Sequence, residues 1–478
     1  MNGVAEAFWN EKPLVEAAEG RWAPRPSRPV QGASIDTRDL REGQVFFALK
    51  GEHTDGHAHL RHADERGAAV VVVSDRNAAR GIEAGVLVVE DVPAALRRLA
   101  TRYREALAAD GARVIGVTGS NGKTTTVRLV YAATRAALRA HAPIKSFNND
   151  LGLPLTLLNA PPGSQMVVCE MGVSRRGDMS RLVDVARPDA AVITSIGRSH
   201  LAGLGSLEGV AREKAAIFSL GPGLAVAPVF GEAVEKLVAP FIDRAHDALR
   251  YGPSGNVRLT MIKSDTTGVQ FTIDDAPFEL ALPGEHAAMN AAAAVLVARW
   301  FGVTDDMIRV GLRAFTPPPM RLQRERIELE AGAIDLINDA YNANPESMLA
   351  AIDTLAGTSV ANRGRRVAIL GDMLELGEDG PALHREIGEA LAARADAAGH
   401  IDACVLVGPL MGFAAERASK AHASDAISVH RELTDEVAET IAASLRPGDI
   451  VLLKASRGVA MERVAEALRR RSSAVGAA

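Results

Sequence analysis

Aromatic residues and cysteines are scarce in this chain of 478 residues. Phe, Trp and Tyr together make up 4% of it, and the cysteines are two, Cys169 and Cys404. Two cysteines cannot build a disulfide framework, and free thiols fit a reducing compartment. Since 47% of the residues are hydrophobic, the scarcity of aromatics predicts cores built from aliphatic side chains.

Long apolar runs and an excess of basic charge are also missing. The longest apolar candidate, Ala291–Ala298, is far shorter than the roughly 20 residues that a membrane helix needs. The first residues, MNGVAEAFWNEK, lack the basic and apolar regions of a secretory signal. The 54 basic residues are outnumbered by 59 acidic ones, which argues against a nucleic-acid partner. We therefore expect a soluble, cytoplasmic protein that has no membrane span and acts as a monomer.

The length and the apolar pattern predict an α/β protein of three domains, since a domain averages about 150 residues. Strands that alternate with helices indicate mostly parallel sheets with flanking helices. Residues 257–282 alternate and are rich in turns, which predicts an added antiparallel sheet. TPPPM, residues 316–320, is the strongest linker signal. We place a smaller α/β domain at residues 1–108, a central P-loop-type domain at 109–316, and a Rossmann-like domain at 317–478.

The segment VIGVTGSNGKTTT, residues 114–126, is the sharpest local signal. A buried strand runs into a glycine-rich turn, and a helix opens directly after it. Glycines let backbone N–H groups curl around phosphate oxygens, and the helix N-terminus adds the positive end of its dipole. Lys123 can reach the β- and γ-phosphates, and the hydroxyl of Thr124 can ligate Mg²⁺. The predicted ATP-binding turn consists of Gly119, Ser120, Asn121, Gly122, Lys123, Thr124 and Thr125.

The turn departs from the strict pattern G-x-x-x-x-G-K-[ST], because Val117 stands where that pattern requires glycine. It is therefore a variant P-loop, and the alternative is a glycine-rich turn with an incidental lysine. A nucleotide-dependent switch protein would also need such a loop, but it would not need three domains. A switch would hydrolyse ATP slowly by itself, whereas a ligase would release phosphate only with its other substrates present.

The form T-G-S-N-G-K-T-T resembles the phosphate loop of the Mur ligase family, and motifs along the rest of the chain agree. SIDTRDLREGQVFFALKGEHTDGHAHL, residues 34–60, looks like the uridine-binding amino-terminal domain of the family's later members. The central domain is represented by NNDLGLPLTLLN, CEMGVSRRGDM and SIGRSHLAGLGSLEGVAREKAAIF. The carboxy-terminal domain is represented by NDAYNANPESM, ILGDMLELG and LLKASRGVAME. The resemblance covers essentially the whole chain.

The resemblance implies an ATP-dependent, ADP-forming amide ligase of peptidoglycan synthesis. DAYNANPESM and GDMLELG favour the family member that adds D-alanyl-D-alanine to UDP-N-acetylmuramoyl-tripeptide through an acyl phosphate. The three domains would hold the UDP-sugar, hold ATP, and bring the dipeptide while closing over ATP. The alternative is a member that adds a single amino acid to the UDP-muramoyl-dipeptide, usually with D-N-P-R/A where this chain has N-A-N-P, residues 342–345. Folylpolyglutamate synthases share the ATP core but lack the first domain.

Predicted catalysis involves four residues: Lys123, Glu170, His200 and Lys214. Glu170 ends a strand at the edge where parallel sheets place ligands, and its carboxylate can hold Mg²⁺ beside Thr124. It could instead cap the next segment. The resemblance implies that His200 lies near a second Mg²⁺ and that Lys214 is carbamylated, which would supply oxygen ligands for the metal. Without that resemblance, His200 would be read as a surface residue and Lys214 as a lysine paired with a neighbouring acid.

Further site residues follow from the resemblance. Nucleotide contacts are expected from Asn290, Arg321 and Asp339, and His286 is left open because Ala287 replaces the asparagine that follows it in the family pattern. The expected UDP-binding residues are Ser34, Asp36, Thr37, Arg38, Lys50 and Gly51. Those expected for the muramoyl-peptide, the dipeptide and closure are Asn148, Asn149, Thr156, Asn342, Asn344, Lys454, Ser456 and Arg457. The spacing of His53, His57 and His59 resembles a metal site, but no acid or cysteine completes it, so we assign it to a substrate loop.

Overall fold

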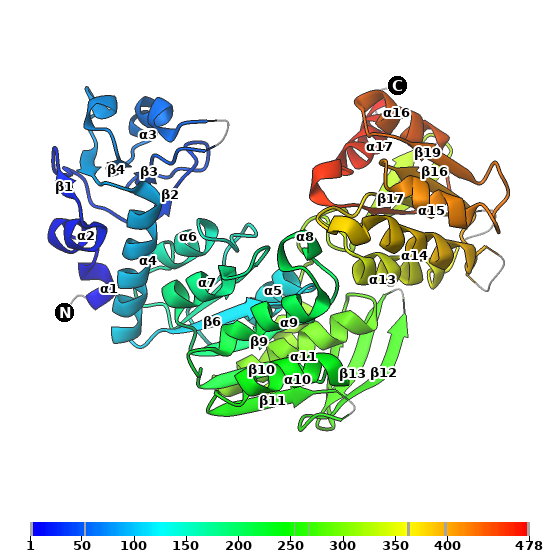
Figure 1. The fold of residues 1–478 in the computed structure, drawn as a ribbon, viewed down its shortest axis with the longest axis horizontal. Coiled ribbons are helices and arrows are strands. Elements are labelled where there is room, and N and C mark those ends of the chain that lie inside the picture. Colours follow the sequence, from blue (N-terminus) through cyan, green and yellow to red (C-terminus); the bar gives the residue numbers. More distant parts are fainter. Residues whose placement is uncertain are drawn as a thin grey trace.

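The computed structural model describes residues 3–51, 54–252, 254–265, 267–360, 364–395 and 399–475. The chain forms three lobes, each built around a mostly parallel sheet with flanking helices, and the outer two rise from either side of the central one (Figure 1). The N-terminal lobe carries the elements up to α4, the central lobe those from β6 to α12, and the C-terminal lobe those from β15 to α17. The predicted α/β class is confirmed, while the domain boundaries at 108 and 316 stay predictions.

The N-terminal lobe is a five-stranded sheet in the order β1-β5-β4-β3-β2, parallel except for β1. Its strands are β1 Arg21–Trp22, β2 Ala33–Ser34, β3 Val45–Phe47, β4 Val70–Val73 and β5 Gly85–Val88. Its helices are α1 Val4–Ala7, α2 Glu11–Ala18, η1 Gly56–His59, α3 Leu60–Glu65, η2 Arg76–Ala79 and α4 Val92–Ala109. The four valines of β4 are all buried, as expected of a parallel strand covered on both faces.

The central lobe has a six-stranded, wholly parallel sheet in the order β11-β10-β9-β6-β8-β7. Its strands are β6 Arg113–Thr118, β7 Ala140–His141, β8 Met166–Glu170, β9 Ala190–Ile193, β10 Leu224–Pro228 and β11 Asp247–Tyr251. Its helices are α5 Lys123–Thr134, α6 Gly152–Leu158, α7 Asp178–Ala186, α8 Leu201–Leu204, α9 Leu207–Ala215, η3 Ala216–Phe218, α10 Glu232–Ile242, α11 Glu285–Trp300 and α12 Asp305–Arg313. The strand β6 lies inside the sheet, so the loop that follows it emerges between β8 and β9.

The predicted antiparallel addition is present as β12 Leu259–Asp265, β13 Gly268–Ile273 and β14 Ala276–Leu280. Helix α11 packs between this small sheet and the rest of the lobe, with contacts to α5, β10 and β13. It is rich in alanine and buried along most of its length. A helix that is apolar all round is expected in such a buried position, which explains the long apolar run seen in the sequence.

The C-terminal lobe is a six-stranded sheet in the order β15-β16-β20-β17-β18-β19, parallel except for β15. Its strands are β15 Gln323–Leu329, β16 Gly332–Asn338, β17 Arg366–Gly371, β18 Ala403–Val407, β19 Ile427–His430 and β20 Ile450–Lys454. Its helices are α13 Pro345–Ala356, η4 Gly377–Asp379, α14 Gly380–Ala392, α15 Met411–Ala418, α16 Asp435–Ser444, η5 Arg457–Val459 and α17 Glu462–Val475. The prolines of TPPPM lie between α12 and β15, outside any helix or strand, as predicted for a linker.

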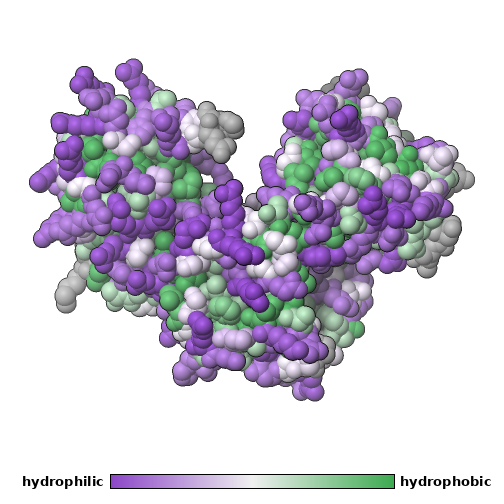
Figure 2. All heavy atoms as spheres, in the orientation of Figure 1, coloured by the Kyte–Doolittle hydropathy of each residue, from purple (hydrophilic) through white to green (hydrophobic). Residues whose placement is uncertain are grey.

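The surface is largely hydrophilic, and Figure 2 shows an open notch between the N-terminal and C-terminal lobes above the central lobe. In the described part of the chain, no helix combines the length and the apolar character that crossing a membrane requires.

Candidate active site

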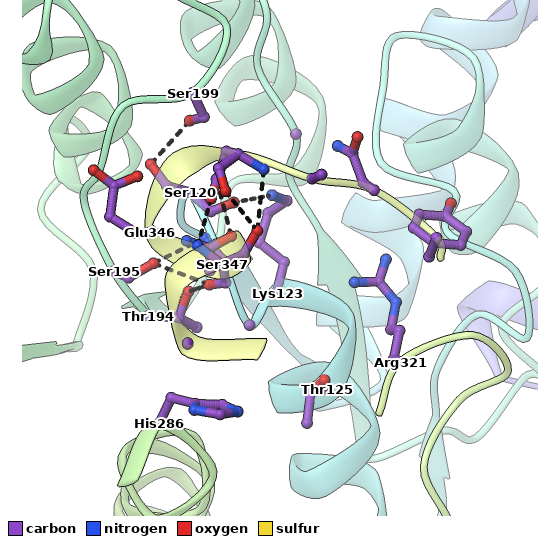
Figure 3. Close-up of a pocket in the computed structure, with 18 of the residues that line it drawn as sticks. Ser120, Lys123, Thr125, Thr194, Ser195, Ser199, His286, Arg321, Glu346 and Ser347 are labelled. Atoms are coloured by element: carbon purple, nitrogen blue, oxygen red, sulfur yellow. Dashed lines mark hydrogen bonds between the residues drawn. The ribbon is translucent and has the colours of Figure 1, made fainter. Parts of the chain in front are cut away.

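A cavity of about 790 Å³ lies where the central and C-terminal lobes meet. In Figure 3, Glu346 and Ser347 of the C-terminal lobe lie beside Ser120 and Ser195 of the central lobe. The predicted site residues that line the cavity are Ser120, Asn121, Gly122, Lys123, Thr125, Asn148, Asn149, Glu170, His200, Asn290, Arg321, Asp339, Asn342, Asn344, Lys454, Ser456 and Arg457. The structure therefore gathers residues from both lobes around one space.

The phosphate loop has the strand–turn–helix context that the sequence predicted: β6 ends at Thr118 and α5 begins at Lys123. Gly122 adopts a left-handed backbone with φ of 81°, and a Cβ there would lie 2.3 Å from the Oδ1 atom of Asn290. At Gly119 a Cβ would lie 1.9 Å from the Oγ1 atom of Thr194. Both glycines are thus required by close approach of neighbouring side chains.

The segment after β9 holds the phosphate loop from one side. The backbone N–H of Asn121 donates to the Oγ atom of Ser195 at 2.8 Å. The hydroxyl of Ser120 donates to the carbonyl of Gly197 and accepts from its N–H, both at 2.9 Å. Ser195 and Gly197 stand in the quoted motif SIGRSHLAGLG, but the motif by itself does not show that they bind a loop some 75 residues earlier.

Two lysines converge on one carbonyl of this loop. The Nζ atom of Lys123 donates to the carbonyl of Gly119 at 2.7 Å, and the Nζ atom of Lys214 donates to the same oxygen at 3.1 Å. Burial lowers the pKa of Lys123, an effect that the carboxylate of Glu170 opposes. Lys214 has no exposed surface, and burial, reinforced by the charge of Lys123, holds its pKa well below the usual range. Both effects shift Lys214 toward its neutral form.

Glu170 ends β8 and is almost fully buried, at 1% exposure. Its carboxylate accepts hydrogen bonds from the hydroxyl of Thr124 at 2.7 Å, the hydroxyl of Ser146 at 2.8 Å and the amide of Asn148 at 2.9 Å. The carboxylate and the hydroxyl of Thr124 are hard oxygen groups of the kind that Mg²⁺ prefers. Among the described residues no cluster of three or more His, Cys, Asp or Glu could hold a metal, so any ion here would need ligands from the nucleotide or water as well.

The opposite wall of the cavity belongs to the C-terminal lobe. The Nζ atom of Lys454 contacts the carboxylate of Asp339 at 2.6 Å and donates to the carbonyl of Asn342 at 3.1 Å. The guanidinium of Arg321 lies over the ring of Tyr341, 4.0 Å from its centre, a geometry that favours a cation. Tyr341 thus orients Arg321, which is expected to contact the nucleotide. The sequence analysis named Tyr341 only as part of the motif DAYNANPESM.

Contacts between the lobes involve two other predicted residues. The amide of Asn344 donates to the Oδ1 atom of Asn121 in the phosphate loop at 2.9 Å. His200 contacts the carboxylate of Glu375 through its Nδ1 atom, and the hydrogen bond lowers the pKa of Glu375. Glu375 was missed because the sequence offers no signal for a partner 175 residues from His200.

Other predicted residues lie away from this cavity. Thr156 is buried in α6, where its hydroxyl donates to the carbonyl of Gly152. Asp36 pairs with Arg38, and that hydrogen bond holds the pKa of Asp36 at about 2. The predicted UDP-binding residues lie in the N-terminal lobe, at Ser34, Asp36, Thr37, Arg38, Lys50 and Gly51. Of the histidine trio, His53 lies outside the described residues.

Remaining members of the predicted set occupy the cavity rim and its floor. Asn290 packs against the phosphate loop from α11, and burial lowers the pKa of its neighbour His286. Arg457 pairs with Glu462 at 2.9 Å. The side chain of Asn149 accepts hydrogen bonds from the N–H groups of Leu151 and Gly152, where α6 begins. These residues have structural partners that a nucleotide or a peptide would have to share or displace.

Comparisons with known proteins agree with this architecture. Three family models match: the Mur ligase family catalytic domain over residues 29–104, the Mur ligase middle domain over 117–298, and the Mur ligase glutamate ligase domain over 320–457. UDP-N-acetylmuramoyl-tripeptide–D-alanyl-D-alanine ligase of Bacillus subtilis is 37% identical over 442 residues, which cover 92% of this chain and 93% of that protein.

Two solved structures extend the likeness to three dimensions. The crystal structure of MurF from Acinetobacter baumannii matches with a TM-score of 0.80 and 28% identity, covering 97% of this chain and 99% of that one. MurF from Thermotoga maritima, solved in complex with ADP, matches with a TM-score of 0.73 and 28% identity, covering 93% of this chain and 98% of that one.

The close contact at Gly122 yields a direct prediction. In Gly122→Ala, a left-handed alanine costs about 1–2 kcal/mol, and its Cβ would displace Asn290. We expect ADP to bind at least about 10-fold more weakly in calorimetric titration, since each 1.4 kcal/mol is a factor of ten. Gly231→Ala is the matched control, because it has an ordinary φ of −62° and nothing within 4 Å of an added Cβ. Equal affinity for ADP in both variants would contradict the assigned role of the loop.

Proposed function

The chain belongs to the Mur ligase family, and we propose that it is the ATP-dependent, ADP-forming ligase that adds D-alanyl-D-alanine to UDP-N-acetylmuramoyl-tripeptide. The product would be the UDP-muramoyl-pentapeptide of peptidoglycan synthesis. One observation carries the proposal: a single cavity joins the phosphate loop and the buried Glu170 to a polar wall of the C-terminal lobe that includes Lys454 and Arg457. The chain matches 93% and 95% of the length of two relatives named for this reaction. That likeness disfavours the alternative ligase, which adds a single amino acid.

The proposed reaction has two steps. A carboxylate oxygen of the tripeptide attacks the γ-phosphorus of ATP, forming an acyl phosphate and releasing ADP. The amine of the dipeptide then attacks the acyl carbon, and phosphate leaves as the amide forms and the amine loses a proton. The first step needs two anions held close together, and the second needs the amine held against the acyl phosphate, both without bulk water, because positioning and charge neutralisation supply most of the catalysis.

The phosphate loop suits the first step. Its backbone N–H groups and the N-terminus of α5 present positive ends of dipoles to an anion. Lys123 begins that helix, and its ammonium can neutralise charge on the transferred phosphoryl group. Asn290 and Arg321 reach the cavity from α11 and from the linker region, where we propose that they contact the nucleotide together with Asp339.

For magnesium, the hydroxyl of Thr124 and the carboxylate of Glu170 offer a fitting pair of oxygen ligands. A bound Mg²⁺ would neutralise phosphate charge at this position. For the second ion, the two predicted side chains offer no oxygen of their own: His200 contacts the carboxylate of Glu375, and Lys214 is an amine directed at the carbonyl of Gly119.

We propose that the UDP end of the tripeptide binds the N-terminal lobe and that its peptide end reaches the cavity along residues 145–149. The geometry of that segment supports this path. Lys145 contacts Asp39, which lies beside the predicted UDP-binding segment, while Ser146 and Asn148 donate to Glu170. The segment thus connects the N-terminal lobe to the buried carboxylate at the reacting end.

The C-terminal lobe would bring the dipeptide. Lys454 ends β20 at the cavity, and Ser456 and Arg457, which follow the strand, also line it. Asn342 and Asn344 face the same space from the loop before α13. We propose that these side chains bind the dipeptide carboxylate and close over ATP. Both cysteines are buried free thiols, which fits a cytoplasmic location; we also propose that the protein is a monomer.

A coupled assay of ADP formation tests the proposed function. We expect ADP release with ATP only when UDP-N-acetylmuramoyl-tripeptide and D-alanyl-D-alanine are both present, because the acyl phosphate must be consumed for turnover. A panel with single amino acids and UDP-muramoyl-dipeptide separates the alternative ligase. Slow ATP hydrolysis that ignores both partners would instead indicate a nucleotide switch.

Removal of the P-loop ammonium should slow catalysis while leaving the fold intact. We expect Lys123→Ala to lower kcat by about 10²–10³, by analogy with loss of one donor that stabilises transition-state charge. Lys236→Ala is the control, because Lys236 is exposed on α10 and pairs only with Glu232 in the same helix. Near-normal turnover of Lys123→Ala in the coupled assay would refute the role of the ammonium.

The comparisons lend no support to the carbamate predicted at Lys214, so it rests on the chemistry of the site alone. A buried, neutral amine can add carbon dioxide, forming an N–C bond and releasing a proton. The resulting anion would replace an amine with oxygen ligands suited to Mg²⁺. We expect Lys214→Ala to lose most activity in the coupled assay and to regain part of it with added acetate. Full activity without acetate would contradict the carbamate.

A further inference from the structure

Arg198 lies between β9 and α8, and it reaches across to two helices of the C-terminal lobe. Its Nε atom donates to the carboxylate of Glu346 in α13 at 2.8 Å. Its two terminal nitrogens donate to the carboxylate of Glu386 in α14, at 2.7 and 2.9 Å. A single guanidinium therefore bridges two carboxylates, an arrangement that its rigid fork allows and a lysine does not.

The same short segment also holds the phosphate loop. Gly197, the neighbour of Arg198, exchanges two hydrogen bonds with the hydroxyl of Ser120. Ser199, on the other side, donates to that hydroxyl at 3.0 Å. A Cβ at Gly197 would lie 3.0 Å from the carboxylate of Glu346, so the backbone is pressed against the C-terminal lobe. Residues 197–199 thus contact the phosphate loop and the C-terminal lobe at once.

The contribution of such a bridge to folding is small. The side chains of Arg198, Glu346 and Glu386 are 31%, 37% and 37% exposed, and ion pairs at this exposure are screened by water and salt. The bridge has a larger effect on the position of the C-terminal lobe relative to the central lobe. The linker between these lobes, residues 316–320, contains three prolines and no helix or strand. Beside this bridge, the two lobes are joined by hydrogen bonds from Asn344 to Asn121 and from the backbone N–H of Ala202 to the carbonyl of Glu375, and by the contact of His200 with Glu375.

We propose that Arg198 is a positioning residue that clamps the C-terminal lobe against the phosphate loop, so that the dipeptide amine is held near the site of acyl phosphate formation. The effect on the dipeptide amine rests on the proposed function. The clamping of the lobe by Arg198 is independent of it. Arg198 is not placed in contact with substrate; it acts through Glu346, Glu386 and the segment that contacts Ser120.

The test compares Arg198→Gln with Arg299→Gln. Arg299 makes a bidentate pair with Asp305 inside the central lobe, at 2.9 Å for both contacts and 28% exposure, so it matches the clamp in chemistry and exposure but joins no lobes. In small-angle scattering without substrates, we expect Arg198→Gln to show a larger radius of gyration than the wild type. We expect no change in Arg299→Gln.

Kinetics supply the second readout. A misplacement of about 1 Å can cost about 100-fold in rate, so we expect kcat/KM for D-alanyl-D-alanine to fall about 10- to 100-fold in Arg198→Gln. The KM for UDP-tripeptide should change little, because the N-terminal lobe is untouched. Arg198→Lys should have an intermediate kcat/KM for the dipeptide. Glu386→Gln should also lower this kcat/KM, and adding it to Arg198→Gln should cause less loss than the two single effects together predict.

Unchanged scattering and unchanged kinetics in Arg198→Gln would overturn the clamp, and so would equal losses in Arg299→Gln. If Arg198→Gln fails to fold by circular dichroism, Glu386→Gln decides the question by the same two measurements. A wild-type protein that forms no ADP with both substrates would refute the proposed function, while the scattering comparison would still decide whether Arg198 clamps the lobes.

Discussion

The carboxyl ends of three neighbouring strands meet at one edge of the central sheet, and the rest of the site depends on this alignment. The register pairs Val117 of β6 with Glu170 of β8, and Thr118 with Ile193 of β9. The phosphate loop, the buried carboxylate and the segment that supports the loop therefore emerge side by side. In open α/β sheets ligands bind at this edge, and here α5 adds its N-terminus to it.

A second constraint is that the cavity has walls from two lobes. The central lobe supplies an anion-binding loop, and the C-terminal lobe supplies Lys454 and Arg321. Polar contacts join them: Asn344 to Asn121, His200 to Glu375, and Arg198 to two glutamates. Such contacts can form and break more readily than an apolar core, so binding of nucleotide or peptide can alter the position of the lobe.

The sequence predicted much of this arrangement because local patterns carry it. The buried strand, the glycine-rich turn and the helix after it were predicted together and form β6, the phosphate loop and α5, and the alternating segment 257–282 forms β12, β13 and β14. The short strands β1, β2 and β7 were missed, since two residues cannot display an alternating pattern. Partners that lie in another lobe were missed for a different reason: Glu375, Glu346 and Glu386 are 148 to 188 residues from the side chains they contact. Such pairs depend on how the lobes dock, which periodicity does not encode.

The central claim is that a substrate carboxylate and the γ-phosphate of ATP meet in the shared cavity and form an acyl phosphate. The most direct measurement uses UDP-N-acetylmuramoyl-tripeptide whose terminal carboxylate carries ¹⁸O in both oxygens, with ATP and D-alanyl-D-alanine. Since the attacking carboxylate oxygen stays with phosphorus when the amide forms, the account predicts one ¹⁸O atom in each phosphate released, read by mass spectrometry. Phosphate that is free of ¹⁸O while the amide product accumulates would contradict it.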